Sequence, residues 1–167
     1  MRVWSVLFLC TANSARSILA EAIVHRVSNG RVIGYSAGSR PRGTVHPAAL
    51  RLLAALDYPL SEFRSKSWDE FAETNAPPID LVVTVCDSAA DEICPVWPGH
   101  PVSAHWGMPD PAAADVERQD EAFSETYRQL HSRIAALVDL HPDRTDLRIF
   151  AKSVQSLHDR LVGYPLT

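Results

Sequence analysis

Short apolar runs alternate with amphipathic segments along the first half of the chain. Residues 3–9 form an apolar, β-rich run, and residues 17–24 have the pattern of a helix after a loop of small polar residues. Residues 32–36 predict a second strand, residues 47–56 a helix that begins with proline, and residues 79–85 an apolar strand. Alternation at these lengths indicates an α/β fold, with a parallel sheet and helices on both faces.

Two longer amphipathic helices are predicted in the last third of the chain. Apolar residues at steps of four and three place the first within residues 115–140, at Phe123, Tyr127, Leu130, Ile134 and Leu137. The same spacing returns after residue 142, at Leu147, Phe150, Val154, Leu157 and Leu161. We therefore expect one domain at residues 1–141, with residues 142–167 as a C-terminal helical extension packed on it.

Composition and charge narrow the class of protein. The 167 residues are 46% hydrophobic and 22% charged, as in an ordinary globular protein. A formal net charge of -4 argues against nucleic-acid binding, and no apolar run is long enough to span a bilayer. The chain has three cysteines, whereas a disulfide framework normally has an even number. The first residues fit a buried strand better than a signal peptide. We expect a cytoplasmic monomer or weak dimer, with no nucleic-acid or membrane partner.

Cys10 and Arg16 stand six positions apart, in the loop between the first predicted strand and helix. In that setting successive backbone N–H groups and the helix N-terminus point at one spot, which favours binding of a tetrahedral oxyanion. Arg16 would clamp it, and the same positive field would lower the pKa of Cys10 to give a nucleophilic thiolate, with Ser17 donating a hydrogen bond to the sulfur. A buried structural cysteine is the alternative, but the position between strand and helix favours the oxyanion site.

The motif resembles the low-molecular-weight protein tyrosine phosphatase superfamily, and more closely its arsenate reductase branch. The resemblance covers roughly residues 3 to 140 and is carried by the apolar run 6–9, by Cys10-Thr11-Ala12-Asn13-Ser14-Ala15-Arg16-Ser17 and by Ala20-Glu21. It implies a flavodoxin-like order of four parallel strands, with an oxyanion bound by residues 11–16. Because Ala15 stands where the family loop often has a second cysteine, a redox partner of Cys10 must lie elsewhere.

Asp110 matches the general acid of this family, on a loop flanked by prolines. The simpler interpretation is a residue that caps the following turn, and the two roles are compatible. In the tyrosine phosphatases the motif continues with an aromatic residue that stacks on the phosphotyrosine ring, whereas Ala112 and Ala113 follow Pro111 here. The missing ring favours a small inorganic oxyanion.

Cys86 ends the apolar strand, and Cys94 follows eight positions later. A helix between them would hold their Cα atoms roughly 12 Å apart. A disulfide needs about 4.4–6.8 Å, so oxidation of this pair would unwind the helix. Structural burial of each cysteine is the plain alternative, and three thiols without metal-ligand spacing argue against zinc.

The resemblance implies a thiol relay through Cys10, Cys86 and Cys94, although relatives often separate the last two by one residue fewer. Cys10 would attack arsenate with Asp110 as acid, Cys86 would attack the Cys10 adduct, and Cys94 would then attack Cys86. We expect no tightly bound cofactor and no metal site. An external thiol reductant would close the cycle, with thioredoxin favoured over glutaredoxin and glutathione.

Further inferences concern residues behind the loop. Asn13 is expected to hold strained loop backbone, with Ser36 as the neighbour that anchors it. Some similar reductases bind potassium through residues that match Asn13, Glu21 and Ser36, but their further acidic ligand is replaced near Ser67. Two other functions remain open at this point, namely a phosphatase for phosphotyrosine or small phosphate esters, and a non-enzymatic arsenic or redox sensor.

Overall fold

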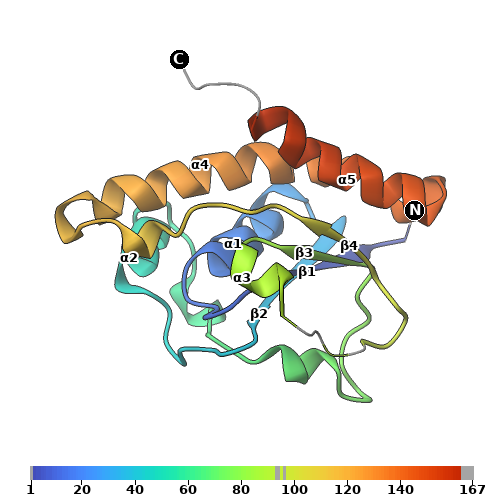
Figure 1. Ribbon diagram of the computed structural model, residues 1–167, viewed down its shortest axis with the longest axis horizontal. Helices are drawn as coiled ribbons and strands as arrows, with labels where there is room; N and C mark the ends of the chain where they lie inside the picture. Colours follow the sequence, from blue (N-terminus) through green and yellow to red (C-terminus); the bar gives the residue numbers. More distant parts are fainter. Residues whose placement is uncertain (1, 93–94, 96, 163–167) are drawn as a thin grey trace.

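The computed structural model describes residues 2–92, 95 and 97–162. Its strands are β1 (Trp4–Cys10), β2 (Val32–Gly38), β3 (Leu81–Thr84) and β4 (Val102–His105). Its α-helices are α1 (Arg16–Val27), α2 (Pro47–Ala55), α3 (Asp87–Ala90), α4 (Gln119–Leu137) and α5 (Leu147–Val162), as Figure 1 shows. Within the described residues, no helix has the length and hydrophobicity needed to cross a membrane.

The four strands form one parallel sheet in the order β2-β1-β3-β4, which confirms the predicted α/β class and flavodoxin-like strand order. Residue Cys10 pairs with Gly38 on β2, and Leu9 pairs with Thr84 on β3. The loops that leave the carboxyl ends of β1 and β3 therefore meet at one edge of the sheet. This edge is where ligands bind in open parallel sheets, and it holds both Cys10 and the residues after Thr84.

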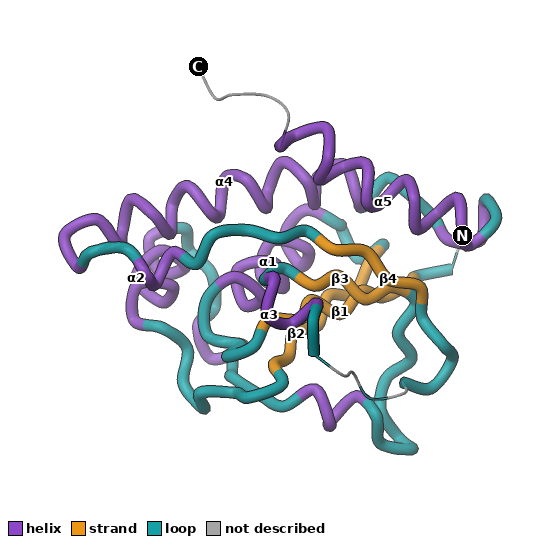
Figure 2. The backbone as a smooth tube through the Cα atoms, in the orientation of Figure 1, coloured by secondary structure: helices purple, strands orange, loops and turns teal. Residues whose placement is uncertain are grey.

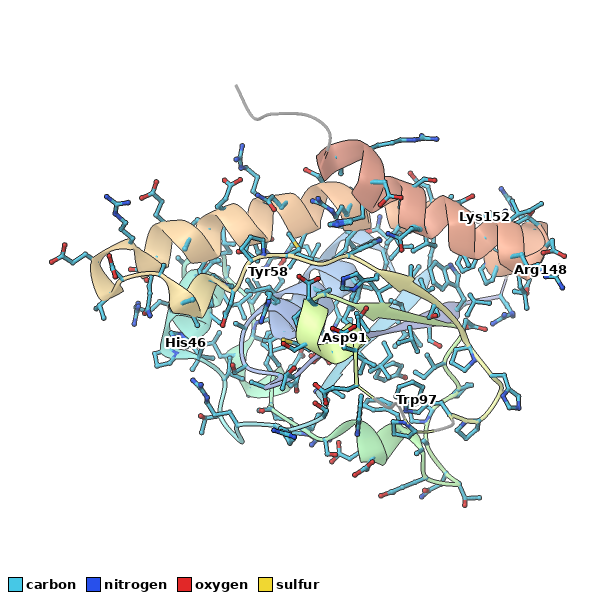
Figure 3. All side chains as sticks on the ribbon, in the orientation of Figure 1. His46, Tyr58, Asp91, Trp97, Arg148 and Lys152 are labelled. Atoms are coloured by element: carbon cyan, nitrogen blue, oxygen red, sulfur yellow. The ribbon has the colours of Figure 1, made fainter. Side chains whose placement is uncertain are left out.

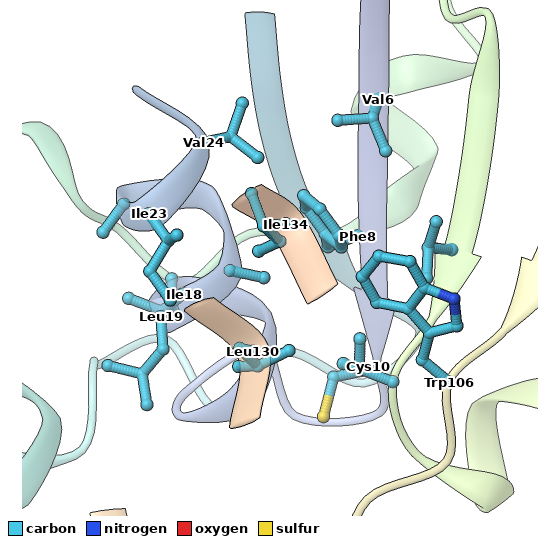
Figure 4. Packing of buried hydrophobic residues seen from close by; sticks show 14 of the residues in the cluster. Val6, Phe8, Cys10, Ile18, Leu19, Ile23, Val24, Trp106, Leu130 and Ile134 are labelled. Atoms are coloured by element: carbon cyan, nitrogen blue, oxygen red, sulfur yellow. The ribbon is translucent and has the colours of Figure 1, made fainter. Parts of the chain in front are cut away.

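Each face of the sheet has its own hydrophobic core. Alternation along β1 sends Val6 and Phe8 to one face and Leu7 and Leu9 to the other. The larger core packs β1 against α1 and α4, and Figure 4 shows the strand facing both helices. The smaller core lies under the 3-10 helix Trp68–Phe71 and its neighbouring segments. The sheet is thus covered by helical structure on both faces.

The C-terminal helix α5 lies along the β4 edge of the sheet and against α4, as Figure 2 shows. Phe150 meets Trp4 edge to face at 5.5 Å between ring centroids, and the Trp106 indole N–H donates to the Val154 carbonyl at 3.0 Å. The Gln155 amide accepts from the backbone N–H of His105 and donates to its carbonyl, both at 2.8 Å. The contact with Trp4 attaches α5 to β1, and the contacts with His105 and Trp106 attach it to β4 and the segment that leads into the Asp110 loop.

Candidate active site

Residues 11–15 connect β1 directly to α1, and their carbonyls are held away from the space beside Cys10. The backbone N–H groups of residues 40, 42 and 46 donate to the carbonyls of residues 11, 12 and 14, at 2.9, 3.0 and 2.8 Å. Peptide N–H groups lie opposite their carbonyls, so the amides of this loop face the cysteine side. In Figure 4 the Cys10 sulfur lies at the end of β1, beyond the packed side chains. This is the geometry predicted for a tetrahedral oxyanion.

Asn13 holds the turn of the loop from a fully buried position with φ of 45°. Its amide donates to the Ser17 hydroxyl oxygen at 2.8 Å, and its carbonyl oxygen accepts from the backbone N–H of Lys66 at 2.9 Å. Gly38 at the end of β2 permits this close approach, because a Cβ there would lie 2.4 Å from the Thr11 carbonyl oxygen. Ser17 therefore braces Asn13, a contact that the sequence prediction of a bond to the cysteine sulfur did not include.

Sequence analysis did not predict a role for Lys66. The contacts of this residue also correct the role predicted for Ser36. The Ser36 hydroxyl donates to the Glu21 carboxylate at 2.8 Å and accepts from the Lys66 ammonium at 3.3 Å. The anchor of Asn13 is thus the backbone of Lys66, and Ser36 holds the side chain of Lys66 instead. A lysine in an irregular segment far along the chain carries no periodic signal, so only the folded contacts reveal it.

Glu21 and Lys66 form a buried ion pair behind the loop, with 3.9 Å between Oε2 and Nζ. Burial raises the pKa of Glu21, while the neighbouring ammonium of Lys66 and the Ser36 hydroxyl oppose this shift. Burial lowers the pKa of Lys66, and the Glu21 carboxylate opposes that shift. Each charge therefore reduces the cost of burying the other.

Arg16 is placed to complete an oxyanion site. One guanidinium nitrogen donates to the Met108 carbonyl at 2.8 Å, which fixes the side chain against the Asp110 loop. Its Nε is buried and has no hydrogen-bond partner among the described residues. A buried charged donor without an acceptor is costly, and an anion in the loop would satisfy it. Arg16 is thus oriented toward a ligand before one binds.

Asp110 lies on the loop that follows β4, where it caps a turn as its sequence suggested and stands beside Arg16. Its Oδ1 accepts from the backbone N–H of Ala112 at 3.0 Å, so it caps the short turn Pro111–Ala113. The same oxygen lies 3.9 Å from Arg16 Nη2, and 45% of the side chain is exposed. A carboxyl beside the anion clamp and open to solvent can deliver a proton to a leaving oxygen.

Cys86 follows Val85, whose backbone N–H donates to the Leu9 carbonyl at 2.9 Å, so Cys86 and Cys10 leave neighbouring strands side by side. Both cysteines are buried, and neither is in a disulfide. Interaction between the two thiols lowers the pKa of Cys86, and the same interaction together with burial raises the pKa of Cys10. One negative charge then belongs to the pair and not to either sulfur alone, so the lowered pKa expected for Cys10 stays a prediction.

The segment after Cys86 differs from the helix assumed in the sequence analysis. Helix α3 spans only Asp87–Ala90, so the separation derived from an eight-position helix does not apply. Cys94 lies outside the described residues. His105 contacts this segment, since its Nε2 lies 2.8 Å from Asp87 Oδ1. Among the residues that the structure describes, no three His, Cys, Asp or Glu side chains are grouped so as to hold a metal ion.

A cysteine oxyanion loop after the first strand of a parallel sheet, with an aspartate loop after the fourth, defines a class of phosphatase-like proteins. The model of the low molecular weight phosphotyrosine protein phosphatase family matches residues 5–149, so the chain belongs to this family.

Relatives named arsenate reductase are similar to this chain. The one from Halalkalibacterium halodurans is 36% identical over 129 residues, which cover 77% of this chain and 88% of that protein. The arsenate reductase structure from Archaeoglobus fulgidus superposes with a TM-score of 0.61 at 28% identity, over 81% of this chain and 99% of that one. A thioredoxin-dependent arsenate reductase of Corynebacterium glutamicum shares the fold with a TM-score of 0.59 at 24% identity, over 93% of this chain and 63% of that one.

Proposed function

We propose that this protein reduces arsenate to arsenite by a thiol relay that begins at Cys10. The observation that carries the proposal is the placement of two cysteines at neighbouring strand ends beside the oxyanion loop, since Cys10 and Cys86 directly follow Leu9 and Val85, which are joined by a 2.9 Å backbone hydrogen bond. Hydrolysis of a phosphate ester needs one nucleophile, a clamp and an acid. Reduction of As(V) to As(III) also needs two electrons, which two thiols supply when they form a disulfide. The names of the relatives support the same substrate.

In the first step the Cys10 thiolate bonds to arsenic, and one arsenic–oxygen bond breaks. The loop amides and Arg16 hold the remaining oxygens, while Asp110 gives its proton to the departing oxygen, which leaves as water. This step uses the groups that the fold places at the carboxyl ends of β1 and β4. Proton transfer within the thiol pair puts the negative charge on Cys10 for the attack and leaves the proton on Cys86.

In the second step the Cys86 sulfur attacks the Cys10 sulfur of the adduct. A sulfur–sulfur bond forms, and the electron pair of the sulfur–arsenic bond stays on arsenic, which leaves as arsenite. Cys94 then attacks Cys86, so that a Cys86–Cys94 disulfide forms and Cys10 is released as a thiolate. The part assigned to Cys94 rests on the family resemblance, since this residue lies outside the described residues.

We propose thioredoxin as the reductant of the Cys86–Cys94 disulfide. A disulfide within one chain is a suitable substrate for a dithiol reductant. The structural neighbour from Corynebacterium glutamicum is described as thioredoxin-dependent, which supports this choice. Glutaredoxin with glutathione is the alternative that the assay must separate.

The potassium site suggested by the resemblance does not fit the residues present. The Lys66 ammonium lies 3.3 Å from Ser36 Oγ and 3.9 Å from Glu21 Oε2, two of the groups that would bind the ion. The Lys66 ammonium therefore already lies beside these oxygens. We propose that its positive charge replaces that of a bound potassium ion. Turnover should be the same in sodium and potassium buffers of equal ionic strength.

The test is arsenate-dependent NADPH oxidation by the full chain, first with thioredoxin and thioredoxin reductase, then with glutaredoxin, glutathione and glutathione reductase. We expect turnover in the thioredoxin mixture and none for Cys86→Ser. Absence of turnover in both mixtures would refute the reductase assignment. Steady hydrolysis of an aryl phosphate by a Cys86→Ser, Cys94→Ser double variant would then favour the phosphatase alternative.

A further inference from the structure

The hydroxyl of Thr11 lies between a thiol and a carboxylate. Its Oγ1 is 3.7 Å from the sulfur of Cys86 and donates to Oε1 of Glu92 at 3.0 Å. Thr11 is the first loop residue after β1, while Cys86 and Glu92 stand on either side of α3. Three polar groups from two separate segments are thus aligned from the second thiol of the relay to an acidic side chain.

The proposed second step requires Cys86 to lose a proton. While Cys10 is the attacking thiolate, the proton of the thiol pair is on Cys86. Once the Cys10 sulfur is bonded to arsenic, it is no longer a base that can take this proton. A thiol is a weak nucleophile beside its thiolate, so another acceptor must be close to Cys86 at this stage.

We propose that Glu92 accepts the proton of Cys86 through the hydroxyl of Thr11, an inference that rests on the proposed arsenate reduction. The Cys86 proton passes to Thr11 Oγ1 while the hydrogen of Thr11 passes to Glu92 Oε1. The hydroxyl is left unchanged, the carboxylate becomes a carboxylic acid, and Cys86 becomes the thiolate that attacks the Cys10 sulfur. Glu92 later returns the proton to an oxygen of the departing arsenite or to water, so protons balance over the cycle.

The chemistry of the three groups fits this direction of transfer. A threonine hydroxyl has one hydrogen to donate and lone pairs to accept, so it can accept from sulfur while it donates to the carboxylate. The other carboxylates of the segment are placed differently, because Asp87 is bonded to His105 and Asp91 is exposed at the end of α3 (Figure 3).

Glu92→Gln tests the path, and Asp91→Asn is the matched control that removes a neighbouring charge. Both are measured by steady-state kinetics, and in a Cys94→Ser background by single-turnover formation of the Cys10–Cys86 disulfide. We expect Glu92→Gln to slow disulfide formation by about 10²-fold, the usual size of a lost proton-transfer group. Inhibition by phosphate and KM should stay unchanged, since the oxyanion loop is intact. Asp91→Asn should behave as the parent.

Three results would overturn the proton path. The first is disulfide formation at the parent rate in Glu92→Gln, and the second is equal slowing by Asp91→Asn, which would indicate a general effect of charge. The third is weaker phosphate inhibition in Glu92→Gln, which would indicate a damaged loop. Thr11→Val should slow disulfide formation, and Thr11→Ser, which restores the hydroxyl, should recover part of the rate lost by Thr11→Val. Failure of the parent chain itself to reduce arsenate would instead refute the proposed function.

Discussion

Arg16 Nη2 lies 3.9 Å from Asp110 Oδ1, although the two residues are far apart in the sequence. Arg16 begins α1 after the first strand, and Asp110 follows the fourth strand. The contact between Arg16 and the Met108 carbonyl holds the two loops together at 2.8 Å. An oxyanion bound by Arg16 would therefore lie next to the carboxyl of Asp110, the proposed general acid.

Replacing Asp110 by Asn should separate its two roles. Asparagine caps a turn as well as aspartate does, so the bond to the Ala112 N–H should persist and the melting temperature should change little. The amide has no proton to transfer, and we expect kcat for arsenate reduction to fall by about 10²-fold or more. Thermal unfolding and thioredoxin-coupled kinetics measure the two effects. An unchanged kcat would show that Asp110 is only a cap.

The shared proton of the thiol pair makes a prediction for cysteine reactivity. Interaction with Cys10 lowers the pKa of Cys86. In a Cys94→Ala background, alkylation of Cys86 by iodoacetamide should therefore have its midpoint below the ordinary thiol value of about 8.5. Replacing Cys10 by Ser removes this interaction, and the midpoint should move up toward that ordinary value. Mass spectrometry of the labelled peptide gives the rates, and equal midpoints in both proteins would contradict the pairing.

Cys94→Ser should stop the relay after its second step. The Cys10–Cys86 disulfide would then accumulate, because its resolving thiol is missing, with one arsenite released per chain. Peptide mapping without reduction should find this disulfide in the variant, and arsenite should be measured in a single turnover. Cys86→Ser is the control and should release none. Continued turnover of Cys94→Ser with thioredoxin would show that the reductant attacks the first disulfide directly.

The helices and strands that were predicted from the sequence are those with a local pattern of apolar residues. The continuous apolar run at residues 3–9 located β1, and apolar steps of four and three located α4 and α5. Strand β4 carried no comparable signal, since it has four residues and only Ala104 among them is buried. It was expected only through the family resemblance. Helix α4 begins at Gln119, because a 3-10 turn at Val116–Arg118 takes up the start of the predicted helix.

The residues of the candidate site also fall into two groups, those that local motifs predict and those that only long-range contacts reveal. Cys10, Arg16 and Asp110 stand in motifs, so the sequence named them before any contact was known. Lys66 and Glu92 stand in no motif, and their roles depend on long-range contacts with Asn13 and Thr11. The charge of Cys10 depends on a long-range contact as well. The loop field favours a thiolate, but Cys86, 76 positions away, interacts with Cys10, so the charge belongs to the pair.

The Glu21–Lys66 pair leads to a prediction for stability. Lys66→Met leaves the buried Glu21 carboxylate without its cation, which should lower the free energy of unfolding at pH 7 by about 3 kcal/mol. Adding Glu21→Gln removes the unpaired charge and should recover most of this loss. The measurements are denaturant unfolding of the two single variants and the double variant, combined in a double-mutant cycle. Simple addition of the single effects would show that the two charges do not interact.

The pH dependence of the same variants follows from the pKa of Glu21. Burial raises this pKa in the folded state, so the stability that protonated Glu21 contributes is present below the unfolded value of about 4.3. It is lost as pH rises through the raised folded pKa. Lys66→Met raises that pKa further, so its destabilisation should be smaller at acidic pH and grow toward neutral pH. The exposed Arg51–Asp120 pair is the control, because Arg51→Met should cost no more than about 1 kcal/mol, with no such trend.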